Sequence, residues 1–483
     1  MSPNRSFSAA SVICTSACQQ DACGACGCAT LSHVKLEDAR RRLPVVTDLP
    51  RPKGRRGLLD SPPGQVPVPK LAVWELTLAC DQACLHCGPR AARPRDDELS
   101  TDECFALVDA LAEAGVGEVV LIGGEAYLRN DFILIIRRIR ERGMSCTMTT
   151  GGYNLTPQRA EAMVEAGIRS VSVSIDGLEA SHDHVRNRPQ SWQRAFAALR
   201  AVRAAGGRVA ANTQINALTR TELRPLLELL APEGIHSWQV QLTVAHGGAA
   251  DHPELLVQPH HLPEIFDELS ALAERCIELG IRLFPANSIG YFGPYERKFR
   301  AFVNDRKHWG GCPAGRSVLG IESNGMLKSC PTLGGPTNIG GSWREHGFRA
   351  LWERAPEIAY TRRRTIDDLW GYCRQCYYAE ACMAGCTAVT EPLLGRPGNN
   401  PYCHHRALEM QRMGYRERVE HVLPAFGVPF DNGLFRVIRE HEDPELRAKH
   451  GPVEIEDPRV SRMVEPLGPG RAVADTGRDE PAP

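Results

Sequence analysis

The regular alternation of short apolar runs with amphipathic segments between residues 71 and 245 restricts the fold of this chain more than any other feature. Apolar and β-branched residues predict strands near 71–79, 118–122, 144–150, 170–175, 208–215 and 236–242. Helical periodicity occupies the segments near 101–114, 130–142, 156–167, 191–205 and 219–231. Repeated strand–helix alternation requires a parallel sheet with crossover helices. The sequence therefore predicts an α/β fold with an incomplete TIM-type (β/α)6 barrel.

Three cysteines, Cys80, Cys84 and Cys87, follow the first predicted strand in a C-x3-C-x2-C spacing. Thiolates this close together on one loop can hold three irons of a cubane iron–sulfur cluster, and no cysteine nearby would bind the fourth iron. Barrel active sites form at the carboxyl ends of the strands, so we expect this cluster in the barrel mouth. The alternative is a structural zinc site that adds His86, although structural zinc usually takes its ligands as two separated pairs.

The C-x3-C-x2-C motif resembles the signature of the radical S-adenosylmethionine (SAM) enzymes, with His86 where that family usually carries an aromatic residue. The resemblance implies that the three cysteines are catalytic and that SAM binds the free iron through its amino and carboxylate groups. Reductive cleavage of SAM then gives a 5′-deoxyadenosyl radical. In such enzymes the cofactor carries the radical chemistry, while the protein binds, orients and excludes competing reactions.

Further segments of the predicted barrel resemble the parts of this family that bind SAM. Gly123-Gly124-Glu125 follows the second strand and matches a Gly-Gly-Glu motif that contacts the SAM amino group. Glycine allows close backbone approach, and a carboxylate complements an ammonium group. The other SAM contacts implied by the resemblance are Thr150, Ser174, Asp176 and Arg186. Ordinary solvation of strand and loop is the alternative for Arg186.

A second group of cysteines lies between residues 312 and 403. Cys312 precedes a predicted hairpin with a tight turn at Asn324-Gly325, and the second strand of this hairpin ends at Cys330. The cysteines that follow are Cys373, Cys376, Cys382, Cys386 and Cys403. This order resembles the SPASM domain of many radical SAM peptide maturases.

The SPASM resemblance implies two auxiliary [4Fe–4S] clusters in addition to the SAM-binding one, three clusters in all. The implied ligands are Cys373, Cys376, Cys382 and Cys403 for a complete cluster, and Cys312, Cys330 and Cys386 for the other. Sulfatase-maturing members supply a further cysteine to the latter, but residues 316–319 contain none. Its fourth iron is therefore either open to a substrate thiolate, as in thioether formation, or closed by a different ligand. A zinc ribbon is the alternative for this whole region.

Composition restricts the class of partners. The chain of 483 residues carries 57 Lys and Arg against 58 Asp and Glu, and its formal net charge of −1 gives no field that would recruit nucleic acid or an anionic membrane. No apolar run is long enough to cross a bilayer, and the N-terminus does not resemble a signal peptide. We therefore expect a cytoplasmic protein that binds neither nucleic acid nor membrane. In that reducing compartment its 18 cysteines predict metal ligation or catalysis rather than disulfides.

Changes in composition divide the chain into six segments. We expect a largely irregular N-terminal extension at 1–70, a radical SAM barrel core at 71–245, a helical connection at 246–308, a SPASM cluster domain with a short β-hairpin and helices at 309–410, C-terminal helices at 411–450 and a disordered tail at 451–483. The cysteines of the extension are Cys14, Cys18, Cys23, Cys26 and Cys28. Their irregular spacing leaves a metal site, a redox clasp and a further cluster open.

The motifs together predict a radical SAM oxidoreductase that modifies a side chain of a ribosomally made precursor peptide or of a protein, with flavodoxin or ferredoxin as reducing partner. Sulfatase maturase-type oxidation of Cys or Ser to formylglycine is one alternative, but Pro331 stands where those enzymes carry an Asp. Small-molecule dehydrogenation is another. A non-catalytic iron–sulfur electron-transfer protein would leave the Gly123-Gly124-Glu125 motif without a purpose.

Overall fold

The computed structural model describes residues 65–300, 308–335 and 337–459, all of which belong to the compact unit Leu49–Pro483. Most of the segment predicted as an N-terminal extension lies outside the described residues, and so do its cysteines, Cys14, Cys18, Cys23, Cys26 and Cys28. The expectations for that segment therefore stay predictions.

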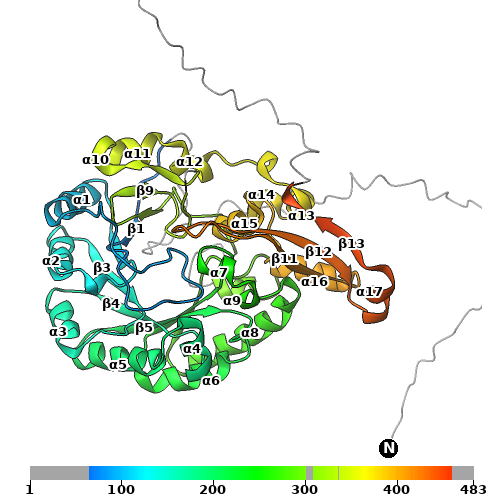
Figure 1. Cartoon of the computed structure of the whole chain (residues 1–483), viewed down its shortest axis with the longest axis horizontal. Helices are drawn as coiled ribbons and strands as arrows, with labels where there is room; N and C mark the ends of the chain where they lie inside the picture. Colours follow the sequence, from blue (N-terminus) through cyan, green and yellow to red (C-terminus); the bar gives the residue numbers. More distant parts are fainter. Residues whose placement is uncertain (1–64, 301–307, 336, 460–483) are drawn as a thin grey trace, which may run out of the picture. The chain divides into compact units, whose positions relative to one another are not determined.

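Parallel strands form the main part of a ten-stranded sheet (Figure 1). Each strand from β1 to β7 pairs in parallel with the next one along the chain. Their bounds are β1 Leu71–Glu75, β2 Glu118–Ile122, β3 Ser145–Thr150, β4 Ser170–Ser174, β5 Val209–Ile215, β6 Ser237–Leu242 and β7 Arg282–Pro285. The predicted order of barrel strands is confirmed. β7 adds a strand within the segment predicted to be a purely helical connection.

The sheet also extends on the other side of β1, through residues far away in the sequence. β8 (Val318–Ile321) pairs in parallel with β1, and β9 (Met326–Lys328) and β10 (Ile339–Ser342) continue as antiparallel strands. The predicted hairpin is β8–β9, and Gly325 in its turn takes a φ of +85°, which suits glycine. The cysteine-rich region therefore begins inside the barrel sheet.

Helices cover the outer face of the barrel strands (Figure 1). The helices of this part of the chain are α1 Thr101–Glu113, α2 Phe132–Glu141, α3 Pro157–Glu165, α4 Glu179–Arg186, α5 Ser191–Ala204, α6 Leu223–Leu230, α7 Gly248–Asp251, α8 Leu262–Glu278 and α9 Glu296–Arg300. Of these, α4 and α7 contact the cysteine loop, because Leu85 N donates to Val185 O and Gly248 N donates to Cys87 O, both at 2.9 Å. Single 3-10 turns are η1 Ala126–Leu128, η2 Ala231–Glu233, η3 Pro253–Leu255 and η4 Pro259–His261. Ser100 and Glu103 form a capping box that begins α1 and so ends the loop after β1.

Short helices build the cysteine-rich region after β10. Their bounds are α10 Trp343–His346, α11 Phe348–Arg354, α12 Pro356–Arg363, η5 Ile366–Asp368, α13 Gly371–Gln375, α14 Ala379–Cys382, α15 Thr387–Leu394 and α16 His404–Arg412. Cys386 and Cys403 are the N-cap residues of α15 and α16. The free backbone N–H groups at a helix N-terminus favour a negatively charged sulfur.

Residues 415–456 form a three-stranded antiparallel sheet, so the prediction of C-terminal helices at 411–450 was wrong for most of that segment. β11 (Tyr415–Leu423) pairs with β12 (Leu434–His441), and β12 pairs with β13 (Pro452–Glu456). β13 also corrects the predicted disorder over its own residues. Helix α17 (Pro444–His450) connects β12 to β13. Arginine and glutamate alternate along these strands and pair across them, which conceals the apolar period that marks a strand.

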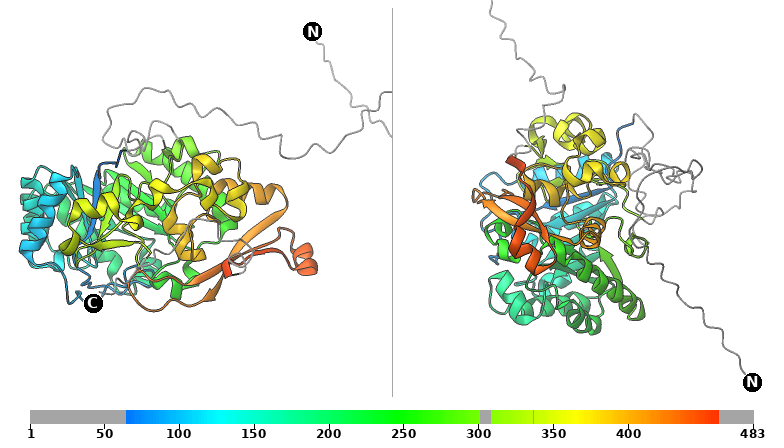
Figure 2. Two further views of the ribbon diagram at one scale, coloured as in Figure 1. Left: turned by 90° about the horizontal axis from the view of Figure 1, so that it is seen from above. Right: turned by 90° about the vertical axis from the view of Figure 1, so that its right-hand side faces the viewer.

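The C-terminal sheet packs on α15 and α16 (Figure 2). Arg406 of α16 is fully buried and joins the two layers. Its Nε lies 2.6 Å from Glu417 Oε2, and its Nη2 lies 2.9 Å from Glu417 Oε1 and 3.0 Å from Glu456 Oε2. A buried guanidinium is tolerated only with such a set of charged partners. The contacts therefore hold β11 and β13 on the cysteine-rich helices.

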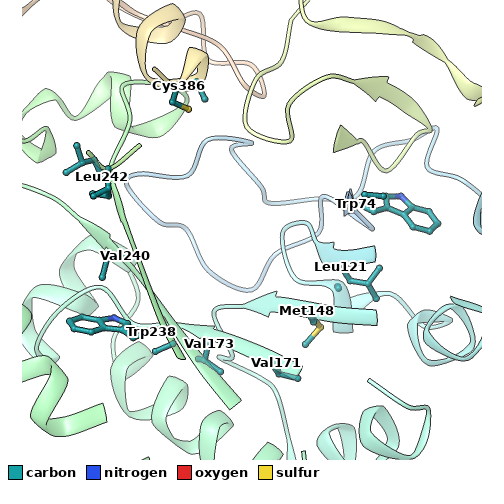
Figure 3. Packing of buried hydrophobic residues seen from close by; sticks show 14 of the residues in the cluster. Trp74, Leu121, Met148, Val171, Val173, Trp238, Val240, Leu242 and Cys386 are labelled. Carbon is teal, nitrogen blue, oxygen red and sulfur yellow. The ribbon is translucent and has the colours of Figure 1, made fainter. Parts of the chain in front are cut away.

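The core lies between the strands and their covering helices. Strand residues such as Trp74, Leu121, Met148 and Trp238 are fully buried and belong to one apolar cluster (Figure 3). The same cluster includes Cys386 and other residues of the cysteine-rich region. The barrel and the cysteine-rich helices therefore share a continuous core.

Candidate active site at the barrel mouth

The loop that follows β1 carries the cysteines of the predicted catalytic motif, Cys80, Cys84 and Cys87, as free and partly buried thiols. Asp81 fixes this loop because its Oδ2 accepts hydrogen bonds from the Tyr127 hydroxyl at 2.8 Å and from the Asn154 side-chain amide at 2.9 Å. Tyr127 and Asn154 follow β2 and β3. The cysteine loop is therefore held at the carboxyl ends of the parallel strands, where barrel active sites form.

Arg186, Asp176 and Cys84 form a buried charged group beside this loop. Arg186 Nη2 lies 2.8 Å from Asp176 Oδ2, and Nη1 donates to Cys84 Sγ at 3.8 Å. Burial raises the pKa of the Cys84 thiol to about 12, and the guanidinium opposes that rise. Burial also opposes ionisation of Asp176, but Arg186 holds the pKa of this carboxyl below its usual value. The positive charge next to Cys84 favours the thiolate form that binds iron.

His86 lies on the same loop and is buried, with Nε2 3.5 Å from Asp176 Oδ2. Burial lowers the pKa of His86 to about 4, so the imidazole is neutral near pH 7. Its Nδ1 has no hydrogen-bond partner among the residues that the structure describes. An uncharged planar ring thus occupies the position before the third cysteine.

The Gly123-Gly124-Glu125 turn lies directly against the end of β1. Gly124 N donates to Thr77 O at 2.9 Å, and Glu125 N donates to Ala79 O at 2.8 Å. A Cβ at Gly124 would lie 2.1 Å from the Ala79 carbonyl oxygen, so this close approach requires glycine. The turn brings the Glu125 carboxylate to the cysteine loop.

Glu125 has a buried carboxyl group that accepts hydrogen bonds from Gly151 N at 2.6 Å and from the Thr150 hydroxyl. Burial raises the pKa of Glu125 to about 8, although both hydrogen bonds oppose the rise. Arg186 also lowers the Glu125 pKa, but no described residue forms a salt bridge with this carboxyl, and a buried carboxylate gains strongly from an ammonium partner. Glu125 therefore suits the amino group of SAM, and Thr150 is held at the same place.

A chain of hydrogen bonds that sequence reasoning missed supports Asp176. His182 Nδ1 accepts from Asp176 N at 3.1 Å, and its Nε2 lies 3.1 Å from Ser191 Oγ. Gln82 on the cysteine loop donates to the same Ser191 oxygen at 3.1 Å. Ser174, at the end of β4, is half-buried and pairs in register with β5. The structure thus brings every residue predicted to contact SAM to one end of the sheet.

The four cysteines predicted for a complete auxiliary cluster line one pocket of about 350 Å³, and they are Cys373, Cys376, Cys382 and Cys403. Two of their sulfurs accept backbone N–H groups: Cys373 from Asn400 at 3.3 Å and Cys376 from Tyr378 at 3.4 Å. Phe292 stacks on Tyr378 at the pocket wall, with ring centroids 4.4 Å apart. Such N–H···S contacts and an aromatic wall are typical of iron–sulfur sites.

Cys312, Cys330 and Cys386 also converge. All three belong to or pack against one apolar cluster. Burial raises the pKa of the Cys386 thiol, and Cys312 and Cys330 raise it further. Cys312 precedes the Gly315 amide, which donates to Ser329 O at 3.1 Å and so ties the two segments together. The described cysteines that belong neither to the barrel-mouth motif nor to the two cysteine sets are buried in barrel elements. They are Cys104, Cys146 and Cys276.

The sulfur positions bear on the zinc alternative. Zn–S bonds of about 2.3 Å place tetrahedral sulfurs roughly 3.8 Å apart. Over the described ranges, Cys80, Asp81 and Glu125 are the one group of three His, Cys, Asp or Glu residues whose ligand atoms all lie within 4.8 Å of one another. In the described residues, therefore, no three sulfurs are as close together as a closed tetrahedral zinc site requires.

The loop between β11 and β12 reaches the barrel mouth, which sequence reasoning did not predict. Phe430 N donates to Gly88 O at 3.0 Å, and Gly247 N donates to Asp431 O at 2.8 Å. Arg90 donates to the Asp431 carboxylate at 2.9 Å. The Asp-Asn-Gly run at 431–433 predicts a turn, but no local pattern identifies the segment that the turn contacts.

His246 lies under this loop, beside the cysteine motif. Its ring occupies the space that a Cβ of Gly88 would take, and its centroid is 6.3 Å from that of Phe430. Burial lowers the pKa of His246 to about 4, so the ring is neutral. Neither ring nitrogen has a hydrogen-bond partner within the described part of the chain. His246 is therefore a candidate substrate-binding group that the sequence did not single out.

Comparison with known proteins agrees with this geometry. The family model for the radical SAM superfamily matches residues 74–230. An AdoMet-dependent heme synthase of Methanosarcina barkeri is 30% identical over 349 residues, which are 70% of this chain and 97% of that protein. This chain belongs to the radical SAM superfamily.

Further proteins are similar to this radical SAM enzyme over most of its length. The mycofactocin maturase MftC of Mycobacterium ulcerans is 27% identical, over 73% of this chain and 94% of that protein. The solved structure of native anSMEcpe with bound AdoMet has a TM-score of 0.55 at 12% identity, over 70% of this chain and 94% of that one. The latter likeness shows a shared fold of partial barrel and SPASM-like region.

As a radical SAM enzyme, the protein uses SAM and a [4Fe–4S] cluster, and the residues at the mouth fit both. The loop carries three free thiols, of which Cys84 contacts the Arg186 guanidinium, and the buried Glu125 carboxyl forms no salt bridge with a described residue. Within the described ranges, no helix combines the length and the apolar character that spanning a membrane would require.

We expect Glu125→Gln to weaken SAM binding about 10- to 150-fold, because one hydrogen bond between charged groups is worth roughly 1.5–3 kcal/mol. Equilibrium dialysis with anaerobically prepared protein measures this change. Glu118→Gln is the matched control, since Glu118 is half-buried at the opposite end of β2. Equal losses of affinity in the two variants would argue against a SAM contact at Glu125.

Proposed function

We propose that this radical SAM enzyme oxidises a small molecule of the tetrapyrrole class that bears carboxylate side chains. The observation that carries the proposal is the similarity to an AdoMet-dependent heme synthase over 97% of that protein's length. This favours the small-molecule alternative over the precursor peptide that the SPASM resemblance suggested. The proposed reaction removes a hydrogen atom from a substrate carbon, passes one further electron to an auxiliary cluster and releases a proton from the neighbouring carbon, so that a carbon–carbon double bond forms.

The residues at the barrel mouth support a compact substrate. The β11–β12 loop engages the backbone of Gly88 and Gly247, which are groups that an extended peptide would otherwise use at this rim. His246 beside them carries two nitrogens without partners among the described residues, in a neutral ring. Neutral imidazole is a common ligand of tetrapyrrole iron and a donor to carboxylates.

The groups that would hold the cofactor have distinct roles. SAM bound at the Cys80, Cys84 and Cys87 cluster supplies an adenosyl radical on one-electron reduction. Glu125 would bind the SAM ammonium group, Arg186 its carboxylate, and Thr150 and Ser174 the ribose side. Arg186 keeps its orientation through the 2.8 Å contact with Asp176. The β11–β12 loop would exclude water from the reacting atoms.

Anaerobic turnover with a defined tetrapyrrole tests the proposal. Iron coproporphyrin III, SAM and dithionite are incubated with reconstituted protein, and 5′-deoxyadenosine and the tetrapyrrole mass are followed together. We expect the tetrapyrrole to raise 5′-deoxyadenosine formation and to lose mass in proportion. Iron octaethylporphyrin, which lacks carboxylates, is the matched control and should change neither. The proposal is contradicted if both compounds change 5′-deoxyadenosine formation and porphyrin mass equally, or if neither compound changes them.

We also propose two auxiliary [4Fe–4S] clusters, and the pocket lined by four cysteines supports the complete one. Cys373, Cys376, Cys382 and Cys403 would bind it, and Cys312, Cys330 and Cys386 would bind the other. These clusters would take up the electron left on the substrate. A flavodoxin or ferredoxin would supply the electron that SAM cleavage consumes.

Alanine at both Cys373 and Cys376 is expected to remove about four iron atoms per chain, because two lost thiolates leave a cubane cluster without half of its ligands. Substrate turnover should stop, while SAM cleavage without substrate persists. Iron analysis and 5′-deoxyadenosine assays measure the two effects. Cys276→Ala, at a lone buried thiol of α8, is the control and should keep all iron. Unchanged iron in the double variant would contradict the assignment.

Modification of a precursor peptide is the second candidate function. The similarity to MftC over 94% of that protein favours it. Sulfatase maturase-type oxidation is a weaker form of the same idea, because Pro331 replaces the Asp that the resemblance requires. A cysteine-bearing peptide encoded near this protein, added to the turnover assay above, would distinguish the two candidates by which substrate changes mass.

A further inference from the structure

Helix α12 packs on the loop that carries Cys312, and it bears Tyr360 on its last turn. The Arg362 guanidinium donates a hydrogen bond to Gly315 O of that loop. A Cβ at Gly315 would lie 1.9 Å from the Ile358 carbonyl oxygen, so helix and loop are in direct backbone contact. The position of α12 is therefore fixed relative to the three-cysteine site.

Tyr360 lies between the segments that carry the three cysteines of this site. The hydroxyl of Thr361, the next residue of α12, donates to Ala314 O, two residues after Cys312, and the Gly315 amide donates to Ser329 O, the residue before Cys330. Burial raises the pKa of Tyr360, and Cys312, Cys330 and Cys386 add to this rise. Thr387, the residue after Cys386, lies beside the hydroxyl as well. Tyr360 thus joins segments that are separated by more than fifty residues in the sequence.

The Tyr360 hydroxyl is buried and makes no hydrogen bond of normal geometry with any described residue. The neighbouring Thr387 hydroxyl already accepts a hydrogen bond from Arg364 at 3.2 Å. Buried hydroxyl groups in folded proteins nearly always have a partner. A partner outside the polypeptide, at the place where the three sulfurs converge, would satisfy this oxygen.

We propose that the Tyr360 phenolate oxygen is the fourth ligand of the iron–sulfur cluster held by Cys312, Cys330 and Cys386. The inference rests on the auxiliary cluster proposed for these cysteines. As the O–Fe bond forms, the phenol releases its proton to solvent, and the oxidation state of the iron does not change. Tyrosine oxygen is an established iron ligand in haem proteins. The site is then closed, so a substrate thiolate does not bind there.

The test uses the full chain with Cys80, Cys84 and Cys87 replaced by alanine, so that the SAM-binding cluster contributes no signal. In this background the parent cluster should not bind cyanide. Tyr360→Phe should keep its iron, shift the electron paramagnetic resonance (EPR) spectrum of the reduced protein and bind cyanide at the freed iron. Tyr360→Cys should keep its iron and should not bind cyanide. Its EPR spectrum should differ from those of the parent and of Tyr360→Phe.

Tyr372→Phe is the matched control, because Tyr372 lines the four-cysteine pocket instead. It should leave the cyanide response as in the parent. The proposal is overturned if the parent and Tyr360→Phe give identical EPR spectra and identical cyanide responses. Such identity is the result expected if the fourth ligand comes from the segment that contains Cys14. A parent with iron for only one auxiliary cluster would instead refute the cluster itself. Iron analysis separates these failures, and neither depends on tetrapyrrole turnover.

Discussion

Alanine at Cys80, Cys84 and Cys87 together should abolish SAM cleavage while iron elsewhere in the protein stays bound. The three thiols lie on one loop after β1, and no other described cysteine lies at the barrel mouth. Removal of all three therefore leaves nothing to hold the cluster that reduces SAM. We expect 5′-deoxyadenosine to fall to the level of a sample without enzyme, with loss of about four iron atoms per chain.

Cys146→Ala is a suitable control for this experiment, because Cys146 is an isolated buried thiol of β3. Its SAM cleavage should match that of the parent. The iron that remains in the triple variant should correspond to the auxiliary sites. Full SAM cleavage by the triple variant would refute the assignment of the motif, and loss of all iron would show that the sites do not load independently.

Arg406→Met should lower the free energy of unfolding by about 3–5 kcal/mol, the cost of breaking a buried ion pair by removal of one partner. The guanidinium is fully buried against Glu417 and Glu456. Burial opposes its charge, but these two carboxylates raise the pKa of Arg406 well above its usual value. Arg406 in turn holds the pKa of Glu456 below its usual value against the effect of burial. Methionine would leave both carboxylates buried without this cation.

Urea unfolding of anaerobically prepared protein, followed by circular dichroism, measures this loss. Arg412→Met is the matched control on the same helix, since Arg412 is 72% exposed and pairs only with Glu409 in the described structure. Exposed ion pairs contribute about 0–1 kcal/mol. Glu456→Gln added to Arg406→Met should recover part of the stability, because Arg406 is the salt-bridge partner of Glu456 among the described residues, whereas Glu417 keeps its contact with Arg439. Equal losses in the two single variants would show that the Arg406 contacts do not hold the C-terminal sheet.

Local patterns in the chain were enough to predict the barrel and to identify the candidate metal-binding cysteines. Strand and helix periods depend on neighbouring residues, and Cys80, Cys84 and Cys87 lie within eight positions of one another. The Gly-Gly-Glu turn was recognisable because it directly follows β2. Each of these signals needs only a short segment, so none required knowledge of distant contacts.

The C-terminal sheet was not predicted, because its strands are stabilised by contacts between distant segments. Glu417 of β11 and Arg439 of β12 occupy positions that an isolated strand would fill with apolar residues, and they pair with each other across the strands at 2.9 Å. Arg406 and Glu454 are their further partners. A search for strands by the alternation of apolar and polar residues counts only apolar residues, so it does not detect such charged pairs. The strands are therefore recognisable only when both are placed side by side.

The substrate class could not be read from the cluster motifs, because enzymes with different substrates share the barrel and the SPASM-like region. Local sequence patterns determined the strand order and the candidate cysteine ligands through short-range geometry. The tertiary fold alone placed Phe430 against Gly88 and helix α12 with Tyr360 against the loop that carries Cys312. Those contacts join segments tens to hundreds of residues apart, and packing of the completed core decides them, not any pattern within one segment.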